Sequence, residues 1–229
     1  MTTVLTGISS MATRQVLAEL ADAYRQRSGV AVEFEAVGGV DAAKRVQAGE
    51  PFDVVVLAAD AIDKLAAGGR VVIDSKSDLV RSEVAIAVRE GSARPDIGSE
   101  EALRRTVLSA SSVGYSTGPS GMALTKLFKR WGIADTIRDR IVQAPPGVPV
   151  GRLVAAGDVE LGFQQLSELM HLPGIAVLGT MPPGAEIVTV FSAALCATSH
   201  QPEAVRALLA FMQSPAATDA MRRHGMTPA

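Results

Sequence analysis

The chain has 229 residues, of which 48% are hydrophobic and 4% aromatic, and its mean hydropathy is +0.24. This length and composition allow one large domain or two small ones with an ample core, and they exclude a disordered chain. The formal net charge is −2, from 22 basic and 24 acidic residues without a basic block. This balance lacks the usual signature of a nucleic-acid-binding protein and favours a small ligand as the partner.

Cysteine, histidine and apolar runs narrow the chemistry further. Cys196 is the single cysteine and lies in an apolar run, so an intrachain disulfide and a thiolate metal cluster are excluded and a buried thiol is expected. His171, His200 and His224 lack acidic or thiol partners at ligand spacing, and we expect solvated positions in loops or at helix ends. No stretch approaches the ~20 apolar residues of a membrane span. We expect no metal, no cofactor and no membrane insertion.

The N-terminus bears on the cellular compartment. Val4 and Leu5 already form the start of a strand, which leaves no room for the charged and apolar regions of a secretion signal. Two alternatives stay open. The protein is periplasmic if a signal peptide has been removed, and otherwise it is cytoplasmic.

In chain order, short β-branched runs alternate with helical patterns, which is typical of βαβ units in an α/β fold. The first part predicts a strand at 4–5, a helix capped by Ser10 and ending near 28–29, a strand at 30–37, a turn at Gly38-Gly39, a short helix over 42–46, a buried strand at 53–57, a helix capped by Asp60 and ending at 68–69, and a long strand at 79–88. The strand at 79–88 is long enough to bridge two lobes.

The second part repeats the pattern. It predicts a helix at 99–108, a strand at 113–115, a helix over 122–131, a helix starting at Asp135, a helix at 148–156 after the turn 145–147, strands at 160–164 and 187–197, a helix over 205–212 and a last short helix from Pro215. We expect a mainly parallel sheet flanked by helices.

Three turns share one design, in which the end of a strand leads through Ser or Gly to the start of a helix. They lie at 6–10, 38–40 and 116–121, the last within the segment Tyr-Ser-Thr-Gly-Pro-Ser-Gly. Free backbone N–H groups and the positive end of the helix dipole suit an anion or a carboxylate at such a turn. If the first two turns lie in one lobe and the third in another, they face each other across a cleft. Ordinary helix capping is the alternative.

Two polar residues could add to such a site. Arg81, beside Ser82 on the long strand, offers a planar fork of donors that matches a carboxylate, although an ion pair with Asp78 or Glu83 is the alternative. Gln164 and Gln165 end a strand and could supply amide donors, although a simple helix start with Ser167 and Glu168 exposed is equally open. The motifs GxGxxG, GxxxxGK[ST] and GxSxG are absent, which leaves nucleotide binding and serine hydrolysis without support.

Three stretches carry a resemblance to a known family: VLTGISSMATRQVLAELADAYRQRSG at 4–29, VGGVDAAKRVQAGEPFDVVVLAADAIDKL at 37–65 and PEAVRALLAFMQSPAATDAMRRHGM at 202–226. With them the chain resembles the type II periplasmic-binding-protein family, in particular the molybdate-binding branch of ABC importers. The resemblance implies two α/β lobes joined by two hinge strands, 1–80 with 188–229 and 81–187, that close on one anion. It also implies a monomer and, if the protein is exported, an ABC permease as partner.

The resemblance also suggests positions for the ligand. The family's first-turn serine falls on Ser9 or Ser10, and its second-turn serine falls on Gly38 or Gly39, where the hydroxyl is missing. The family's late tyrosine corresponds to the stretch 163–167, which has no tyrosine. The expected ligand-binding residues are Ser9, Ser10, Gly38, Gly39, Arg81, Ser82, Ser116, Ser120, Gly121, Met122, Val148 and Gln164.

The segments YSTGPSG and GFQQLSEL resemble a subgroup of this family that includes aconitate isomerase. Two functions therefore stay open. The first is binding of a small oxyanion or organic polycarboxylate in the cleft between two lobes. The second is isomerisation of a tricarboxylate by a 1,3-proton shift, which needs a base; Glu83, Tyr115 and Glu168 are candidates, and the catalytic residue is unknown.

Overall fold

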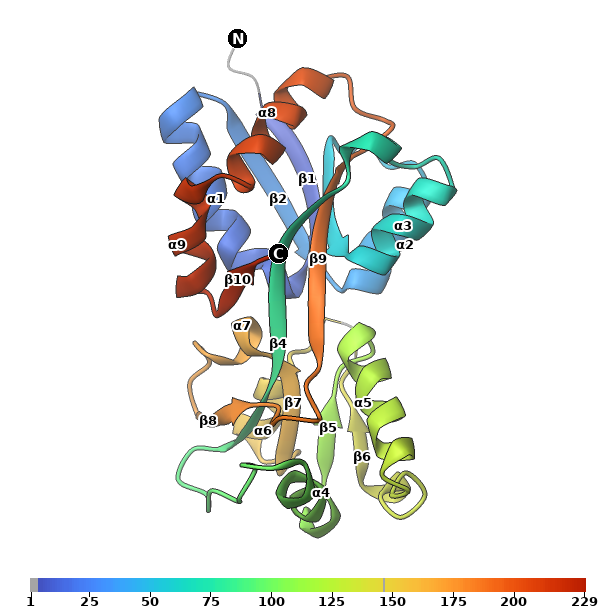
Figure 1. The fold of residues 1–229 in the computed structure, drawn as a ribbon, viewed down its shortest axis with the longest axis vertical. Helices are drawn as coiled ribbons and strands as arrows, with labels where there is room; N and C mark the ends of the chain where they lie inside the picture. The colour runs from blue at the N-terminus through green and yellow to red at the C-terminus, as the bar shows by residue number, and fades with distance from the viewer. Residues whose placement is uncertain (1–3, 146) are drawn as a thin grey trace. The chain divides into compact units, whose positions relative to one another are not determined.

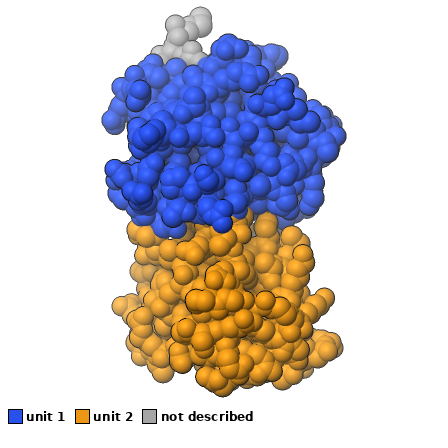
Figure 2. Space-filling view, viewed as in Figure 1, with its two compact units in different colours: residues 1–81, 190–229 blue, residues 82–189 orange. Residues whose placement is uncertain are grey.

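The computed structural model describes residues 4–145 and 147–229, and it confirms the α/β fold expected from the sequence (Figure 1). The chain divides into two compact units (Figure 2): unit 1 comprises Met1–Arg81 and Val190–Ala229, and unit 2 comprises Ser82–Thr189. The chain passes from one unit to the other within two strands, β4 (Ser77–Arg89) and β9 (Val188–Leu195).

Unit 1 is built on a mixed sheet with the strand order β2-β1-β3-β9-β4. Strand β1 (Val4–Ser10) pairs in parallel with β2 (Ala31–Val37) and β3 (Val54–Ala58), β3 pairs antiparallel with β9, and the short β10 (Met226–Pro228) pairs with β4. The five residues of β3 are all buried, as expected for a central strand covered on both faces.

The helices of unit 1 cover both faces of this sheet (Figure 1). One hydrophobic cluster joins the sheet to α1 (Arg14–Ser28), α8 (Pro202–Met212) and α9 (Pro215–Arg223). A second cluster joins it to α2 (Gly39–Gln47) and α3 (Ala59–Ala67). Two short 3-10 helices, η1 (Met11–Thr13) and η2 (Ile73–Ser75), precede α1 and β4.

Unit 2 has the strand order β4-β7-β5-β6. Strand β5 (Val113–Tyr115) pairs in parallel with β6 (Ile141–Gln143) and β7 (Leu161–Gln165), while β4 pairs antiparallel with β7 and β8 (Ile175–Thr180). The parallel strands β5, β6 and β7 therefore end at the same edge of the sheet, which is the edge where ligands bind in open α/β sheets.

Helices cover both faces of the unit 2 sheet as well. The cluster on one face includes α4 (Glu100–Ser109) and α5 (Pro119–Arg130), whereas α6 (Val150–Ala156) and α7 (Leu166–Leu169) contribute to two smaller clusters. Tyr115, Phe128 and Phe163 pack ring against ring in the first cluster, with centroids 6.2–6.3 Å from Phe128. Each hydrophobic cluster of the described residues belongs to one unit alone.

Two local expectations from the sequence are wrong. Asp135 does not start an α-helix: it lies in a turn followed by the 3-10 helix η3 (Arg138–Arg140) and then β6. Asp60 is not a cap either, because α3 already begins at Ala59 and its N-cap is Ala58. Ser10 is a cap as expected, since its hydroxyl accepts the Ala12 N–H at the start of η1, and the Ser99 hydroxyl accepts the Ala102 N–H at the start of α4. The short strands β6, β8 and β10 were not anticipated.

Candidate functional site

In unit 1, the end of β1 lies beside the start of α2. Ser10, the last residue of β1, is in register with Val37 of β2, and a Cβ added at Gly39 would lie 3.7 Å from Ser10 Oγ. The N-cap of α2 is Gly38, so no side chain caps the first backbone N–H groups of this helix. Ser10 and the Gly38-Gly39 turn therefore lie side by side, and the helix start keeps donors for an anion.

Ser9 supplies a buried hydroxyl at the same end of β1. Its side chain is fully buried, and its Oγ has no hydrogen-bond partner within the described part of the chain. A buried hydroxyl normally has a partner, so an orphaned one marks a position where an additional polar group fits.

In unit 2, the turn after β5 presents a similar but more polar helix start. Gly118 is the N-cap of α5 and offers no side-chain cap, and Pro119 occupies the first helical position, where its fixed φ suits the helix. The first backbone bond of the helix runs from the Met122 N–H to the Gly118 carbonyl. The N–H groups of Ser120 and Gly121 precede it and have no acceptor inside the helix.

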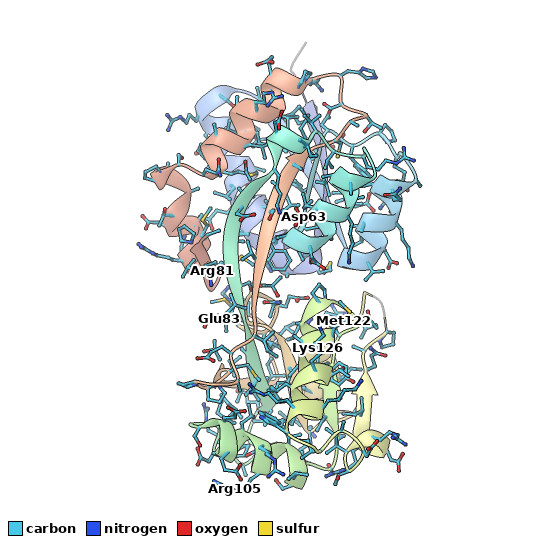
Figure 3. All side chains as sticks on the ribbon, turned by 45° about the vertical axis from the view of Figure 1, so that its right-hand side comes forward. Asp63, Arg81, Glu83, Arg105, Met122 and Lys126 are labelled. Carbon is cyan, nitrogen blue, oxygen red and sulfur yellow. The ribbon has the colours of Figure 1, made fainter. Side chains whose placement is uncertain are left out.

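The serine hydroxyls of this turn lie together. Ser116 Oγ and Ser120 Oγ are 3.4 Å apart, and Ser120 is buried in the first turn of α5 without being its cap. A Cβ at Gly121 would lie 1.8 Å from the Ser116 carbonyl oxygen, so the backbone approaches here more closely than any side chain permits. Figure 3 shows Met122 and Lys126 on α5, and Met122 is 55% exposed.

Gln164, expected at the ligand, has partners of its own inside unit 2. Its Nε2 donates to Glu168 Oε1 at 2.8 Å, and its Oε1 accepts the Gly151 N–H at 3.2 Å. The alternative with an exposed Ser167 and Glu168 is wrong, since Ser167 is buried and Glu168 is partly buried. Burial raises the pKa of the Glu168 carboxyl to about 7, although the hydrogen bond from Gln164 acts in the opposite direction.

The neighbouring Gln165, a possible amide donor in the sequence, is not among the twelve expected ligand-binding residues. It is the last residue of β7 and only 4% exposed; its Nε2 donates to Thr189 Oγ1 at 2.9 Å, and its Oε1 has no partner among the described residues. The partner Thr189 lies 24 residues further along the chain. Local sequence patterns carry no signal for such a contact.

The remaining expected residues differ in what surrounds them. Arg81 and Glu83 are exposed on β4 (Figure 3), and the described residues give Arg81 no ion pair with Asp78 or Glu83. Ser82 is fully buried, and its hydroxyl, like that of Ser9, lacks a partner in the described chain. The N–H of Val148 already donates to the Pro145 carbonyl at 3.0 Å, so this group closes a turn.

The expectations for cysteine and histidine are met only in part. Cys196 is buried as expected, and burial raises the pKa of its thiol to about 12, which makes it unreactive at neutral pH. His224 lies at the end of α9 as expected, but it is partly buried rather than solvated, and its Nε2 lies 2.8 Å from Glu19 Oε2. Within residues 4–145 and 147–229, no group of three His, Cys, Asp or Glu side chains could hold a metal ion. No described helix is both long and apolar enough to cross a membrane.

Comparison with known sequences supports the resemblance seen in the motifs. Residues 5–227 match the family model described as bacterial extracellular solute-binding protein. An aconitate isomerase of Pseudomonas sp. is 39% identical over 99% of this chain and 88% of its own length. The molybdate-binding protein ModA of Azotobacter vinelandii is 24% identical over 90% of this chain and 83% of its own length.

Comparison with solved structures supports the fold. The periplasmic molybdate-binding protein of Azotobacter vinelandii has a TM-score of 0.80 at 19% identity, covering 97% of this chain and 98% of that one. The sulfate-binding protein SubI of Mycobacterium tuberculosis has a TM-score of 0.80 at 18% identity, covering 99% of this chain and 87% of that one. The chain belongs to the bacterial extracellular solute-binding protein family and has the α/β fold of its periplasmic binding proteins.

Proposed function

We propose that this member of the solute-binding family takes a small organic polycarboxylate as its ligand. The observation that carries the proposal is the helix start at Ser116–Met122, with its two neighbouring hydroxyls and the N–H groups of Ser120 and Gly121. Such a cluster of donors at the positive end of a helix dipole binds one carboxylate. The start of α2, with Ser9 and Ser10 beside it, offers a second set of donors in unit 1.

Exposed apolar side chains favour an organic acid over an inorganic oxyanion. Met122 in the first turn of α5 is 55% exposed, and Val40 in the first turn of α2 is 47% exposed. A carbon skeleton can contact such side chains, whereas molybdate or sulfate presents only oxygen atoms to its site. Aconitate, named in the 39% identical relative, is an acid with three carboxylates and an apolar body.

A thermal-shift panel tests the ligand class. Molybdate, tungstate, sulfate, citrate and the two aconitates are added separately, and the midpoint of unfolding is measured for each. We expect citrate or an aconitate to raise the midpoint more than molybdate does, because at equal concentration the ligand that binds the folded state more tightly stabilises it more. A response to molybdate alone would remove the polycarboxylate proposal.

A second candidate function is isomerisation of an aconitate-like tricarboxylate, and the buried Glu168 carboxyl with its raised pKa is the observation that favours it. In a 1,3-proton shift one C–H bond breaks, the double bond moves by one carbon, and a C–H bond forms at the far carbon without net oxidation. The base that takes the proton can return it. Burial raises the pKa of Glu168 to about 7, so this carboxyl can accept and donate a proton at neutral pH.

Ultraviolet absorbance tests the isomerase directly. Incubation with cis- or trans-aconitate should change the absorbance until equilibrium is reached, and Glu168→Gln should abolish the change while binding persists. A flat trace at high protein concentration, together with tight binding, would leave only the binding function.

The same binding function also suggests a partner. We propose that a copy exported to the periplasm delivers its ligand to an ABC permease, as a monomer. Export of the native gene product and permease genes beside it would support delivery. Enzymes of tricarboxylate metabolism beside the gene would favour the isomerase.

A further inference from the structure

Three polar side chains of unit 2 come together where β4, β7 and β9 meet. Val84 is opposite Gln165 in the antiparallel pair of β4 and β7, so Ser82, two residues before Val84, lies on the same face of the sheet as Gln165. The N–H of Val84 donates to the Ile187 carbonyl. Since β4 enters unit 2 and β9 leaves it, the strands run in opposite directions and Thr189 lies beside Ser82. Gln165 Nε2 donates to Thr189 Oγ1 at 2.9 Å, which links two of the three side chains.

This cluster contains two orphaned polar atoms. Ser82 is 0% exposed and Gln165 is 4% exposed, yet Ser82 Oγ and Gln165 Oε1 have no hydrogen-bond partner in the described chain. Folded proteins satisfy nearly all of their buried polar atoms, and each unsatisfied atom opposes folding. Two such atoms on one face of a sheet indicate a position that another polar group completes.

The two atoms define what that group must offer. Gln165 Oε1 is an acceptor and needs an O–H or N–H donor, whereas a carboxylate or a tetrahedral oxyanion at neutral pH presents acceptors. The Ser82 hydroxyl can donate to an oxygen. One group that donates to Gln165 Oε1 and accepts from Ser82 Oγ meets both needs, and the hydroxyl of a hydroxy acid is such a group.

The cluster lies at the same sheet edge as the serine turn. Phe163 is in register with Tyr115, so Gln165, two residues further along β7, ends at the edge where the turn 116–121 begins. We propose that Ser82, Gln165 and Thr189 form a hydroxyl subsite that makes the protein selective for a hydroxy-polycarboxylate. The inference rests on the polycarboxylate function proposed above and specifies which polycarboxylates bind best.

Citrate and tricarballylate test the hydroxyl subsite, because both carry three carboxylates on the same carbon chain and only citrate has a hydroxyl. Isothermal titration should show that the wild-type protein binds citrate at least about tenfold more tightly than tricarballylate. Tricarballylate lacks the hydroxyl and leaves the buried polar atoms of the subsite unpaired. Gln165→Met and Ser82→Ala should each bring the ratio of the two affinities close to one. The affinity for tricarballylate should change little.

Matched measurements keep the outcomes distinct. Gln26→Met, on the exposed face of α1, should retain the wild-type ratio. Equal wild-type affinities for citrate and tricarballylate would overturn the hydroxyl subsite and leave polycarboxylate binding intact. The same conclusion would follow if both subsite variants retained the wild-type ratio of the two affinities. If neither acid binds, the polycarboxylate function itself fails. Should Gln165→Met not fold, as judged by circular dichroism, the smaller change Ser82→Ala decides.

Discussion

At the residue scale, the serine hydroxyls differ in what they do for the fold. The hydroxyls of Ser99 and Ser10 each accept a backbone N–H and so stabilise a helix start. Among the described residues the Ser120 hydroxyl makes no such bond: it contacts only the Ser116 hydroxyl, at the long distance of 3.4 Å. Its hydroxyl therefore contributes little to folding and is available to a ligand.

The first prediction concerns Ser120→Ala. Loss of one hydrogen bond to a charged carboxylate should weaken ligand binding by about 1–3 kcal/mol while the stability of the free protein changes little. Titration calorimetry measures the affinity and urea unfolding measures the stability. Ser109→Ala, which removes an exposed hydroxyl at the end of α4, is the control. Unaltered affinity in Ser120→Ala would show that the hydroxyl does not contact the ligand.

The second prediction concerns the pH dependence of stability through Glu168. Burial raises the pKa of this carboxyl in the folded protein from its ordinary 4.5 to about 7. The folded state therefore binds the proton more tightly. Proton binding by Glu168 therefore stabilises the folded state fully below about pH 4.5, and this stabilisation is lost as the pH rises through about 7. A shift of this size corresponds to roughly 3 kcal/mol.

Glu168→Gln removes this titration. Relative to the variant, the wild-type free energy of unfolding should fall between pH 5 and pH 8, as measured by urea unfolding at both values. The exposed Glu90→Gln should follow the wild-type pH dependence. If the free energy of unfolding of Glu168→Gln has the same pH dependence as that of the wild type, the Glu168 carboxyl titrates normally. Its proposed role as the base of the isomerisation then loses its support.

At the scale of elements, the start of α5 depends on two glycines with different roles. Gly118 has φ −78°, and a Cβ there would lie 3.8 Å from Ser116 Oγ, so the turn accepts a side chain at this position. At Gly121 the corresponding atom would lie 1.8 Å from the Ser116 carbonyl. The glycine at 121 therefore fixes how closely the turn folds back onto α5.

The third prediction follows from this difference. Gly121→Ala should destabilise the protein by about 1–3 kcal/mol, as for an overpacked site, and should also weaken ligand binding because the turn must shift. Gly118→Ala in the same turn should cost less, about 0.5 kcal/mol, because the N-cap has room for a methyl group although glycine is preferred over alanine there. Thermal unfolding and calorimetry on both variants provide the measurement. Equal behaviour of the two variants would contradict the assignment of Gly121 as the close contact.

Local patterns in the sequence predicted the elements that depend on local chemistry. The buried run of β3 and the cap at Ser10 are examples. The expected helix at Asp135 failed because Ile133 and Ile137 have helical spacing but form one isolated turn, joined by a single bond from the Ile137 N–H to the Ile133 carbonyl. Contacts between distant residues, such as His224 with Glu19, lay beyond any local pattern. The orphaned oxygen of Gln165 belongs to the same class.

At the scale of the whole molecule, exposed apolar side chains bear on the oligomeric state. The large ones, Val4, Val40, Ile73, Met122 and Val188, lie on five different elements of the described chain. Single exposed apolar residues on separate elements are normal for a monomer and do not by themselves indicate the contiguous patch that a stable dimer buries.

The fourth prediction is therefore a monomer. Light scattering on the eluting protein should give a mass near 23.8 kDa, both in free protein and with saturating citrate. A doubled mass in the presence of citrate alone would show that the ligand causes dimerisation, and this result would contradict a monomeric binding function.

The division of unit 1 into two stretches of chain has a consequence for synthesis on the ribosome. Unit 2 is continuous from Ser82 to Thr189, so its core can form while the last segment is still being made. Unit 1 must wait for β9, which covers the side of β3 not paired with β1. Until then the apolar strand Val54–Ala58 has an open edge, the usual starting point of aggregation. We expect a chain that stops at Thr189 to depend on chaperones for its first 81 residues.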